Sequence, residues 1–155
     1  SWRGYVFRSA TFPGALLKKR KESFGINIED RRGLEVKVTG LERTMVDVFD
    51  RPDLGGGWEE IWRSLDLVDY LNLEKVVRYA LLLDNSTTVA KVGFYLEQNR
   101  ERLMVDDSHL NRLRKKMPPT PRKMERTGSQ PGKFVSAWNL AVPRPVFEKA
   151  WEEIT

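Results

Sequence analysis

The sequence predicts an α+β fold, in which a small antiparallel or mixed sheet from both chain ends packs on a central group of helices. Segments near both ends have the alternating apolar pattern or β-branched composition of strands. In the middle of the chain, apolar residues recur every three or four positions, as they do in helices that face a core. The chain has 155 residues and is 40% hydrophobic. This is enough for one ordinary core, so we expect a single domain over residues 1–155.

The first part of the chain is predicted to be sheet. Residues 4–8 have strand composition, and residues 25–29 alternate apolar with polar side chains before a turn at Asp30-Arg31-Arg32-Gly33. Residues 34–38 alternate again, which indicates a hairpin whose second strand leads directly into a helix. Three apolar side chains of that strand are expected on one face: Leu34, Val36 and Val38.

A helix is expected to begin immediately after the hairpin. Thr39 and Glu42 have the spacing of a capping box, in which the Thr39 hydroxyl accepts from the Glu42 N–H and the carboxylate returns to the Thr39 N–H. Arg43 and Asp47 are four residues apart and can form an ion pair on the helix surface. The inward face is predicted to contain Leu41, Met45 and Val48 or Phe49.

Further helices follow a break at Pro52 and Gly55-Gly56-Gly57. The first is marked by Trp58, Ile61, Trp62 and Leu65 and should end near Asp66. Asn72 is a candidate N-cap for a helix with an apolar stripe, and Ser86 for the helix that contains Gly93. A mid-helix glycine costs ~1 kcal/mol relative to alanine, so Gly93 indicates close contact with another helix.

The last third of the chain mixes helix, loop and strand signals. A helix is predicted from Ser108 to Lys116, ending before Pro118-Pro119. Residues 118–132 contain four prolines and are expected to form a mobile loop around one short strand. Residues 133–140 have strand character, and Pro145 suits the first turn of a final helix through Trp151.

One motif resembles a known family. Behind the apolar strand comes Glu42-Arg43-Thr44, then two apolar residues, then Asp47. This pattern resembles the signature of the AbiEi-type antitoxin and transcriptional-regulator family of bacterial defence systems. The resemblance runs from about Val36 to Leu96, with a weaker similarity at Trp138-Asn139-Leu140.

The resemblance implies a non-enzymatic antitoxin domain of a type IV toxin–antitoxin system for viral defence. In such proteins an N-terminal winged-helix domain binds operator DNA, and a C-terminal domain of this kind is associated with neutralising a nucleotidyltransferase-like toxin. No winged-helix pattern precedes the hairpin, so the chain resembles the C-terminal domain alone. The expected partners are therefore DNA in the full-length protein and a cognate toxin.

The residues of this motif have an ordinary structural interpretation. The predicted cap accounts for Glu42, and an i,i+4 pair accounts for Arg43 with Asp47. We expect them to join the sheet to the helices. An alternative site uses Asp30, Glu35 and Lys37, because two carboxylates and a lysine in an Asp…Glu-x-Lys order resemble the magnesium site of one nuclease superfamily.

The charge distribution suggests a second candidate site. The net charge is +5, but residues 42–84 carry ten acidic and five basic residues, a balance of −5 that leaves +10 elsewhere. Lys18 to Lys21 form one basic run. The larger basic segment can neutralise phosphates or form a solvated face, and it contains Arg112, Arg114, Lys115, Lys116, Arg122, Lys123 and Arg126. It has no aromatic residue that would stack on bases.

Several classes of site are excluded by composition. There is no cysteine and only one histidine, His109, so thiol sites and histidine-based metal or catalytic clusters are not expected. The three glycines at 55–57 lack the lysine and hydroxyl residue of a phosphate-binding loop. We therefore expect no enzyme activity and no cofactor. Without a signal peptide or a long apolar run, a cytoplasmic protein with no membrane partner is expected.

Overall fold

The computed structural model describes residues 3–125 and 132–149 and has the predicted α+β fold. Its helices and strands, in chain order, are α1 (Gly14–Lys19), β1 (Ile26–Arg31), β2 (Leu34–Thr39), α2 (Leu41–Asp50), η1 (Pro52–Gly55), α3 (Trp58–Asp66), α4 (Leu73–Leu82), α5 (Ser86–Gln98), α6 (Asp107–Arg114), β3 (Arg122–Lys123), β4 (Lys133–Val135), η2 (Ser136–Trp138), β5 (Leu140–Val142) and α7 (Arg144–Glu148). The prediction of helices in the middle and strands near both ends is confirmed.

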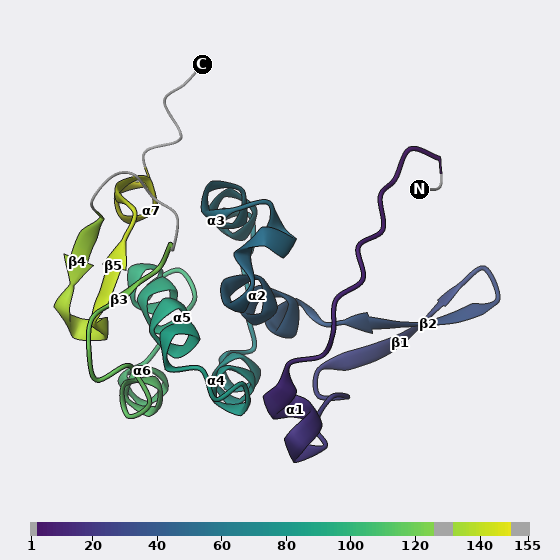
Figure 1. The fold of residues 1–155 in the computed structure, drawn as a ribbon, viewed down its shortest axis with the longest axis horizontal. Coiled ribbons are helices and arrows are strands. Elements are labelled where there is room, and N and C mark those ends of the chain that lie inside the picture. Colours follow the sequence, from purple (N-terminus) through teal and green to yellow (C-terminus); the bar gives the residue numbers. More distant parts are fainter. Residues whose placement is uncertain (1–2, 126–131, 150–155) are drawn as a thin grey trace.

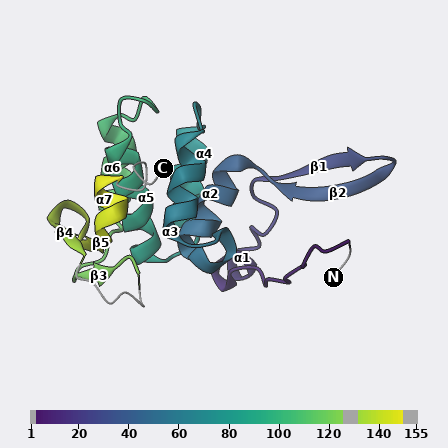
Figure 2. The same cartoon turned by 90° about the horizontal axis from the view of Figure 1, so that it is seen from above.

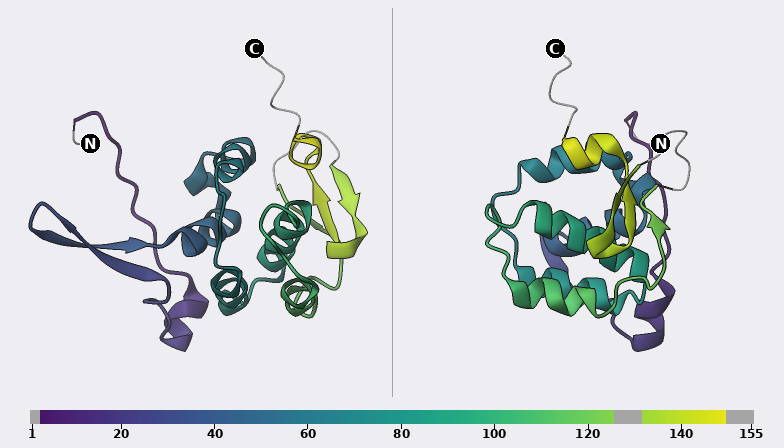
Figure 3. Two further views of the ribbon diagram at one scale, coloured as in Figure 1. Left: turned by 180° about the vertical axis from the view of Figure 1, so that it is seen from behind. Right: turned by 90° about the vertical axis from the view of Figure 1, so that its left-hand side faces the viewer.

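The strands form two separate sheets on opposite sides of the helices (Figure 1). β1 and β2 pair only with each other, whereas β3, β5 and β4 form a three-stranded mixed sheet in that order. Figure 3 shows the same separation from behind. The prediction that strands from both chain ends share one sheet is therefore wrong. The reason is that α2, α4, α5 and α6 pack between the two sheets and prevent them from meeting.

The predicted hairpin is confirmed. β1 pairs with β2 in an antiparallel register that places Arg31 opposite Leu34, which leaves a two-residue turn at Arg32 and Gly33. Both turn residues have positive φ, of 57° and 83°, as a type I′ turn requires. The Asp30 carboxylate accepts from the Gly33 N–H at 2.8 Å. Figure 2 shows that the hairpin projects away from the helices.

The segment before α1 is extended but does not join a sheet. Residues 4–8 were expected to form a strand, and the structure has only an isolated bridge at Tyr5. The side chains of Tyr5, Val6 and Phe7 are 66%, 84% and 76% exposed, so they have no core to face. That prediction is wrong because strand composition is not sufficient where no partner strand lies alongside.

The core of the helical body is built around aromatic side chains. Trp62 is fully buried and stacks on Phe49 of α2 at 5.2 Å between ring centroids. Tyr95 of α5 meets the edges of both rings. The Trp62 indole N–H donates to Gln98 Oε1 at 2.8 Å, so this buried donor is satisfied. The predicted helix from Trp58 to Asp66 is confirmed at both ends.

Two of the three predicted helix caps need correction. Asn72 caps α4 as expected, because its side chain accepts from the Lys75 N–H. The cap of α5 is Asn85 and not Ser86, since the Asn85 side chain accepts from two N–H groups of the first turn. The Thr39–Glu42 capping box is wrong: the N-cap of α2 is Gly40, with no side-chain cap hydrogen bond.

Gly93 marks a close approach between α5 and the short 3-10 helix η2. A Cβ at Gly93 would lie 2.3 Å from the ring of Trp138, which is fully buried and belongs to η2. The glycine thus makes the space that seats the indole of Trp138 on α5. Because η2 interrupts residues 133–140, the single strand predicted there is instead β4, the 3-10 turn and the start of β5.

Most of the predicted features of the C-terminal part are confirmed where the structure describes them. α6 buries Leu110 and Leu113, and Pro145 lies in the first turn of α7. β3 is the short strand expected within the proline-rich segment. Residues 126–131 of the predicted loop, and Ala150 and Trp151 of the predicted final helix, lie outside the described residues. The final helix was expected to continue through Trp151, but α7 ends at Glu148, and Lys149 is its C-cap in the left-handed conformation.

Candidate functional site

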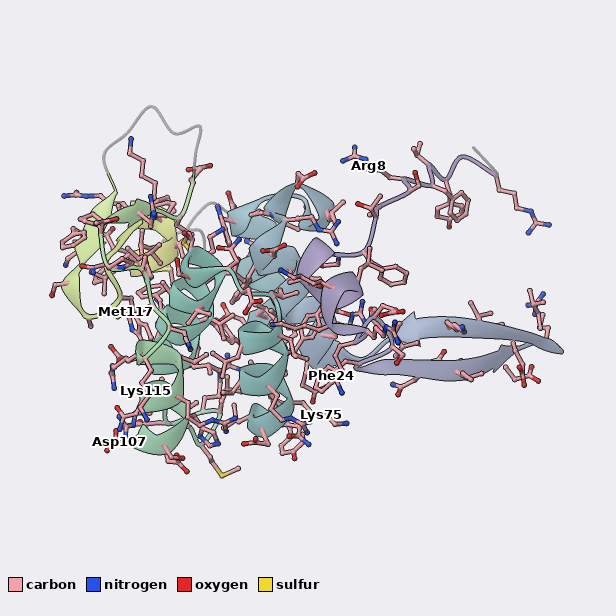
Figure 4. All side chains as sticks on the ribbon, turned by 60° about the horizontal axis from the view of Figure 1, so that its bottom comes forward. Arg8, Phe24, Lys75, Asp107, Lys115 and Met117 are labelled. Atoms are coloured by element: carbon pink, nitrogen blue, oxygen red, sulfur yellow. The ribbon has the colours of Figure 1, made fainter. Side chains whose placement is uncertain are left out.

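Arg43 is the most heavily bonded charged residue among Glu42, Arg43, Thr44 and Asp47. It lies on α2 with its side chain only 3% exposed. Its Nη1 donates to the carbonyl oxygens of Glu22 and Phe24, at 2.6 and 2.7 Å, and its Nε donates to Asp47 Oδ2 at 3.4 Å. The guanidinium also lies 5.2 Å from the centre of the Tyr79 ring. Arg43 therefore joins α2 to the segment before β1, near Phe24 at the base of the hairpin (Figure 4).

Asp47 connects the same helix to α4. Its Oδ1 accepts from the Tyr79 hydroxyl at 2.5 Å while its Oδ2 faces Arg43. Burial raises the pKa of the Asp47 carboxyl above its usual value, although the Tyr79 hydrogen bond and the Arg43 charge both act in the opposite direction. Burial and the hydrogen bond to Asp47 raise the pKa of Tyr79 as well, so the hydroxyl remains a donor.

Glu42 and Thr44 also bond to neighbouring segments. Glu42 Oε1 accepts from the backbone N–H of Asn72 at 2.9 Å, which joins the start of α2 to the start of α4. Thr44 Oγ1 donates to the Gly40 carbonyl, and it lies 2.7 Å from Thr39 Oγ1. These bonds replace the predicted capping box, because the Glu42 carboxylate turns toward α4 instead of back toward Thr39.

The four motif residues therefore have their polar groups directed at other parts of the same chain. All four lie in the first two turns of α2, and none lines the groove described below. The partners of Arg43 and Asp47 could not be found from the sequence, because the Glu22 and Phe24 carbonyls and Tyr79 are distant along the chain. The only sequence signal was the i,i+4 spacing, which correctly predicted the Arg43–Asp47 pair.

The basic segment divides into paired and unpaired residues. Arg112 forms an ion pair with Glu74 and Arg114 with Glu97, both at 2.6 Å. The Arg114 guanidinium also lies over the Trp138 ring at 5.1 Å. These two arginines join α6 to α4 and α5, so their charges are largely compensated. Neither belongs to a free basic surface.

The unpaired cations lie at the end of α6 and on β3. Lys115 and Lys116 are exposed just beyond the last turn of α6, and Figure 4 shows Lys115 on the outer side of that helix. Arg122 and Lys123 are exposed on β3. Among the described residues, these four side chains make no ion pair, whereas Arg126 lies outside the part that the structure describes.

A groove lies beside β3, with a volume of about 1180 Å³. Its lining contains Asp50, Arg51, Pro52, Asp53, Gly57, Trp58, Leu83, Asp84, Asn85, Ser86, Thr87, Lys91, Arg122, Lys123, Met124 and Glu125. Four of these residues are acidic and four are basic, so the charges balance. Asp50 accepts from Asn85 and from Thr88, and Asp84 pairs with Lys19 at 2.8 Å. The groove therefore has no excess charge of either sign.

The carboxylates of the alternative nuclease site lie on the projecting hairpin. Asp30 is opposite Glu35, and Ile28 is opposite Lys37, so Asp30, Glu35 and Lys37 share one face. All three are exposed, and Asp30 already accepts from the Gly33 N–H at the turn. Within residues 3–125 and 132–149, no group of three or more Asp, Glu, His or Cys side chains is arranged to hold a metal ion.

Comparisons with known proteins give no family assignment. No family model, no curated protein and no solved structure matches this chain. Within the part of the chain that the structure describes, none of the helices has the length and apolar character needed to cross a membrane.

Proposed function

We propose that this chain is a non-enzymatic antitoxin and regulator domain of the AbiEi type, which neutralises a nucleotidyltransferase-like toxin and supports repression of its own operon. The residues that carry the resemblance are Glu42, Arg43, Thr44 and Asp47. The proposal is our own and rests on this motif together with the contacts that its residues make.

The observation that carries the proposal is the buried network of Arg43. Its side chain is only 3% exposed, and its Nη1 and Nε donate to two carbonyl groups and one carboxylate of the same chain. A motif whose polar groups bond to other parts of the same chain holds the fold together and does not contact a substrate. Function is then expected from exposed surfaces that bind a partner, as in a neutralising protein.

The DNA part of the proposal assigns contacts to the unpaired cations. Lys115, Lys116, Arg122 and Lys123 are exposed and free of ion pairs among the described residues, so they can approach phosphates without breaking a bond. Arg112 and Arg114 would first have to leave Glu74 and Glu97. We therefore assign phosphate contact in the full-length protein to the first four residues.

The experiment that tests toxin neutralisation is co-expression. A nucleotidyltransferase-like protein encoded beside this gene is induced in cells with and without the full-length protein, and growth is followed. The proposal predicts that growth is restored by the wild-type protein and by a control variant Lys18→Ala on the surface of α1. Growth arrest that is unchanged by the full-length protein would contradict it.

The alternative function, a magnesium-dependent nuclease, is tested by a DNA cleavage assay. Purified protein is incubated with plasmid DNA and magnesium, and the same is done with Glu35→Ala. Our proposal predicts no magnesium-dependent cleavage in either sample. Cleavage by the wild-type protein that is lost in Glu35→Ala would replace the binding function with a hydrolytic one.

A further inference from the structure

The outer edge of β2 is an open hydrogen-bonding edge. The Gly40 N–H donates to the Gly25 carbonyl at 2.8 Å, which identifies residues 25 and 40 as a hydrogen-bonded pair of the ladder. Because such pairs alternate along antiparallel strands, Leu34, Val36 and Val38 bond to β1. The backbone groups of Glu35, Lys37 and Thr39 therefore point outward from the hairpin. The hairpin stands clear of the helices (Figure 2), and its sheet has only two strands.

A two-stranded hairpin with two exposed faces is marginally stable in water unless something adds to it. This hairpin exposes 65% of Ile28 and 68% of Leu34. It also places Asp30 opposite Glu35, and like charges in that position destabilise a strand pair. An additional strand that brings a positive charge beside Glu35 would relieve this repulsion and cover apolar surface.

We propose that two copies of this chain associate by pairing their β2 strands in antiparallel orientation, with Val36 at the two-fold axis. In this register Glu35 of each copy lies opposite Lys37 of the other, and Leu34 lies opposite Val38. The result is a four-stranded sheet with two opposite-charge pairs. Its six apolar side chains from Leu34, Val36 and Val38 form one continuous stripe on one face.

The charges select this register among those that the backbone allows. The outward groups belong to Glu35, Lys37 and Thr39, so neighbouring registers would place either Glu35 opposite Glu35 or Lys37 opposite Lys37. Both put like charges face to face. The register centred on Val36 is the one in which each charge meets its opposite.

The outer edge of β1 does not offer an equivalent pairing. Its outward groups belong to Ile26, Ile28 and Asp30, and the Ile26 N–H already donates to the Ser23 carbonyl. Antiparallel pairing of this edge with itself, centred on Asp30, Glu29 or Ile28, would place Asp30 opposite Asp30, Glu29 opposite Glu29, or Asp30 opposite Ile26. Each of these registers brings together like charges or a charge and an apolar residue. The register centred on Asn27 pairs Ile26 with Ile28 and requires the Ile26 N–H, which is already bonded. The second copy is therefore assigned to β2.

The test is a charge-reversal set on two exposed residues. Glu35→Lys and Lys37→Glu each turn both pairs of the dimer into like-charge pairs, whereas the double variant restores opposite charges in reversed order. An equimolar mixture of the two single variants also restores both pairs, in a heterodimer. Matched controls with the same charge changes away from the hairpin are Glu101→Lys and Lys18→Glu, both on exposed side chains.

Mass is measured by analytical ultracentrifugation over a range of protein concentrations. We expect the average mass to rise with protein concentration from 18.0 kDa toward twice that value in five samples: wild type, both controls, the double variant and the mixture. Each single variant alone should need at least about tenfold more protein to dimerise, since two cross-strand pairs become repulsive. A wild-type protein that stays monomeric at every concentration would overturn the inference, as would single variants that dimerise like the wild type. This inference does not depend on the proposed function.

Discussion

At the scale of single residues, the side chain of Arg43 joins two segments of the chain. Its guanidinium is buried and makes hydrogen bonds to three acceptors from two segments. Removing it leaves Asp47 Oδ2 and the carbonyl groups of Glu22 and Phe24 without the donor that Arg43 provides. Buried groups that lose a partner keep the full cost of their desolvation.

We predict that Arg43→Met lowers the free energy of unfolding by about 3 kcal/mol, because the substitution breaks a buried ion pair and leaves the partner charge in place. Chemical denaturation followed by circular dichroism measures this change. The control is Lys75→Met on the exposed face of α4, which should change the free energy by less than about 0.5 kcal/mol. Equal effects of the two substitutions would contradict the role assigned to Arg43.

The raised pKa of Asp47 leads to a prediction about pH. Between its ordinary value of 3.8 and the raised value, the folded protein holds a proton at Asp47 that the unfolded chain has lost. Stability from this group therefore falls as pH rises through that interval and is constant above it. Denaturation midpoints of wild type and Asp47→Asn, compared at several pH values, should show this fall only in the wild type. An Asp47 contribution that instead increases with pH would mean that Arg43, and not burial, dominates.

At the scale of elements, the sequence predicted local structure better than contacts. Helix α3, the cap at Asn72 and the hairpin turn depend on residues close in sequence, and these predictions are confirmed. The capping box failed because Glu42 bonds to Asn72, thirty residues away, instead of to Thr39. The single sheet failed for the same reason, since nothing in the strand composition says which strands meet.

In the candidate site, too, local features could be predicted from the sequence but contacts between distant residues could not. The basic segment and the Arg43–Asp47 pair were identifiable from the sequence. The ion pairs that occupy Arg112 and Arg114 were not, because Glu74 and Glu97 lie on other helices. Counting positive charges along the chain therefore overstates the free basic surface.

The contact between α5 and η2 gives a prediction at this scale. Gly93→Ala would place a methyl group against the Trp138 ring and should cost about 2 kcal/mol of stability, as overpacking of a core does. Gly14→Ala is the matched control, because no atom lies within 4 Å of the added carbon. Thermal denaturation compares the two variants.

A second substitution checks the cause of that loss. Combining Gly93→Ala with Trp138→Phe removes the atoms that the methyl group would meet, so the two changes together should cost less than the sum of their separate effects. Strict additivity would show that the loss at Gly93 comes from elsewhere.

At the scale of the whole molecule, the structure separates the bonded motif residues of α2 from the exposed surfaces to which we assign binding. The motif residues hold α2 to α4 and to the segment before β1. The unpaired cations of the basic segment lie just beyond the end of α6 and on β3, and the open strand edge lies on the opposite side of the helices (Figure 1). A molecule arranged in this way can contact DNA or a toxin on one side and a second copy on the other.

We propose that this chain binds DNA through four unpaired surface cations, Lys115, Lys116, Arg122 and Lys123. The most direct test measures binding of the full-length protein to DNA from its own promoter region over a range of salt concentrations. A variant with Lys115, Lys116, Arg122 and Lys123 all changed to Gln is compared with a control in which Arg112→Gln and Glu74→Gln remove one ion pair without changing net charge.

We expect the four-residue variant to bind more weakly and to show a smaller slope of the logarithm of the binding constant against the logarithm of salt concentration, because fewer counterions are released. The control should keep the wild-type slope. Equal affinity and equal slope in all three proteins would contradict the claim that these cations contact DNA.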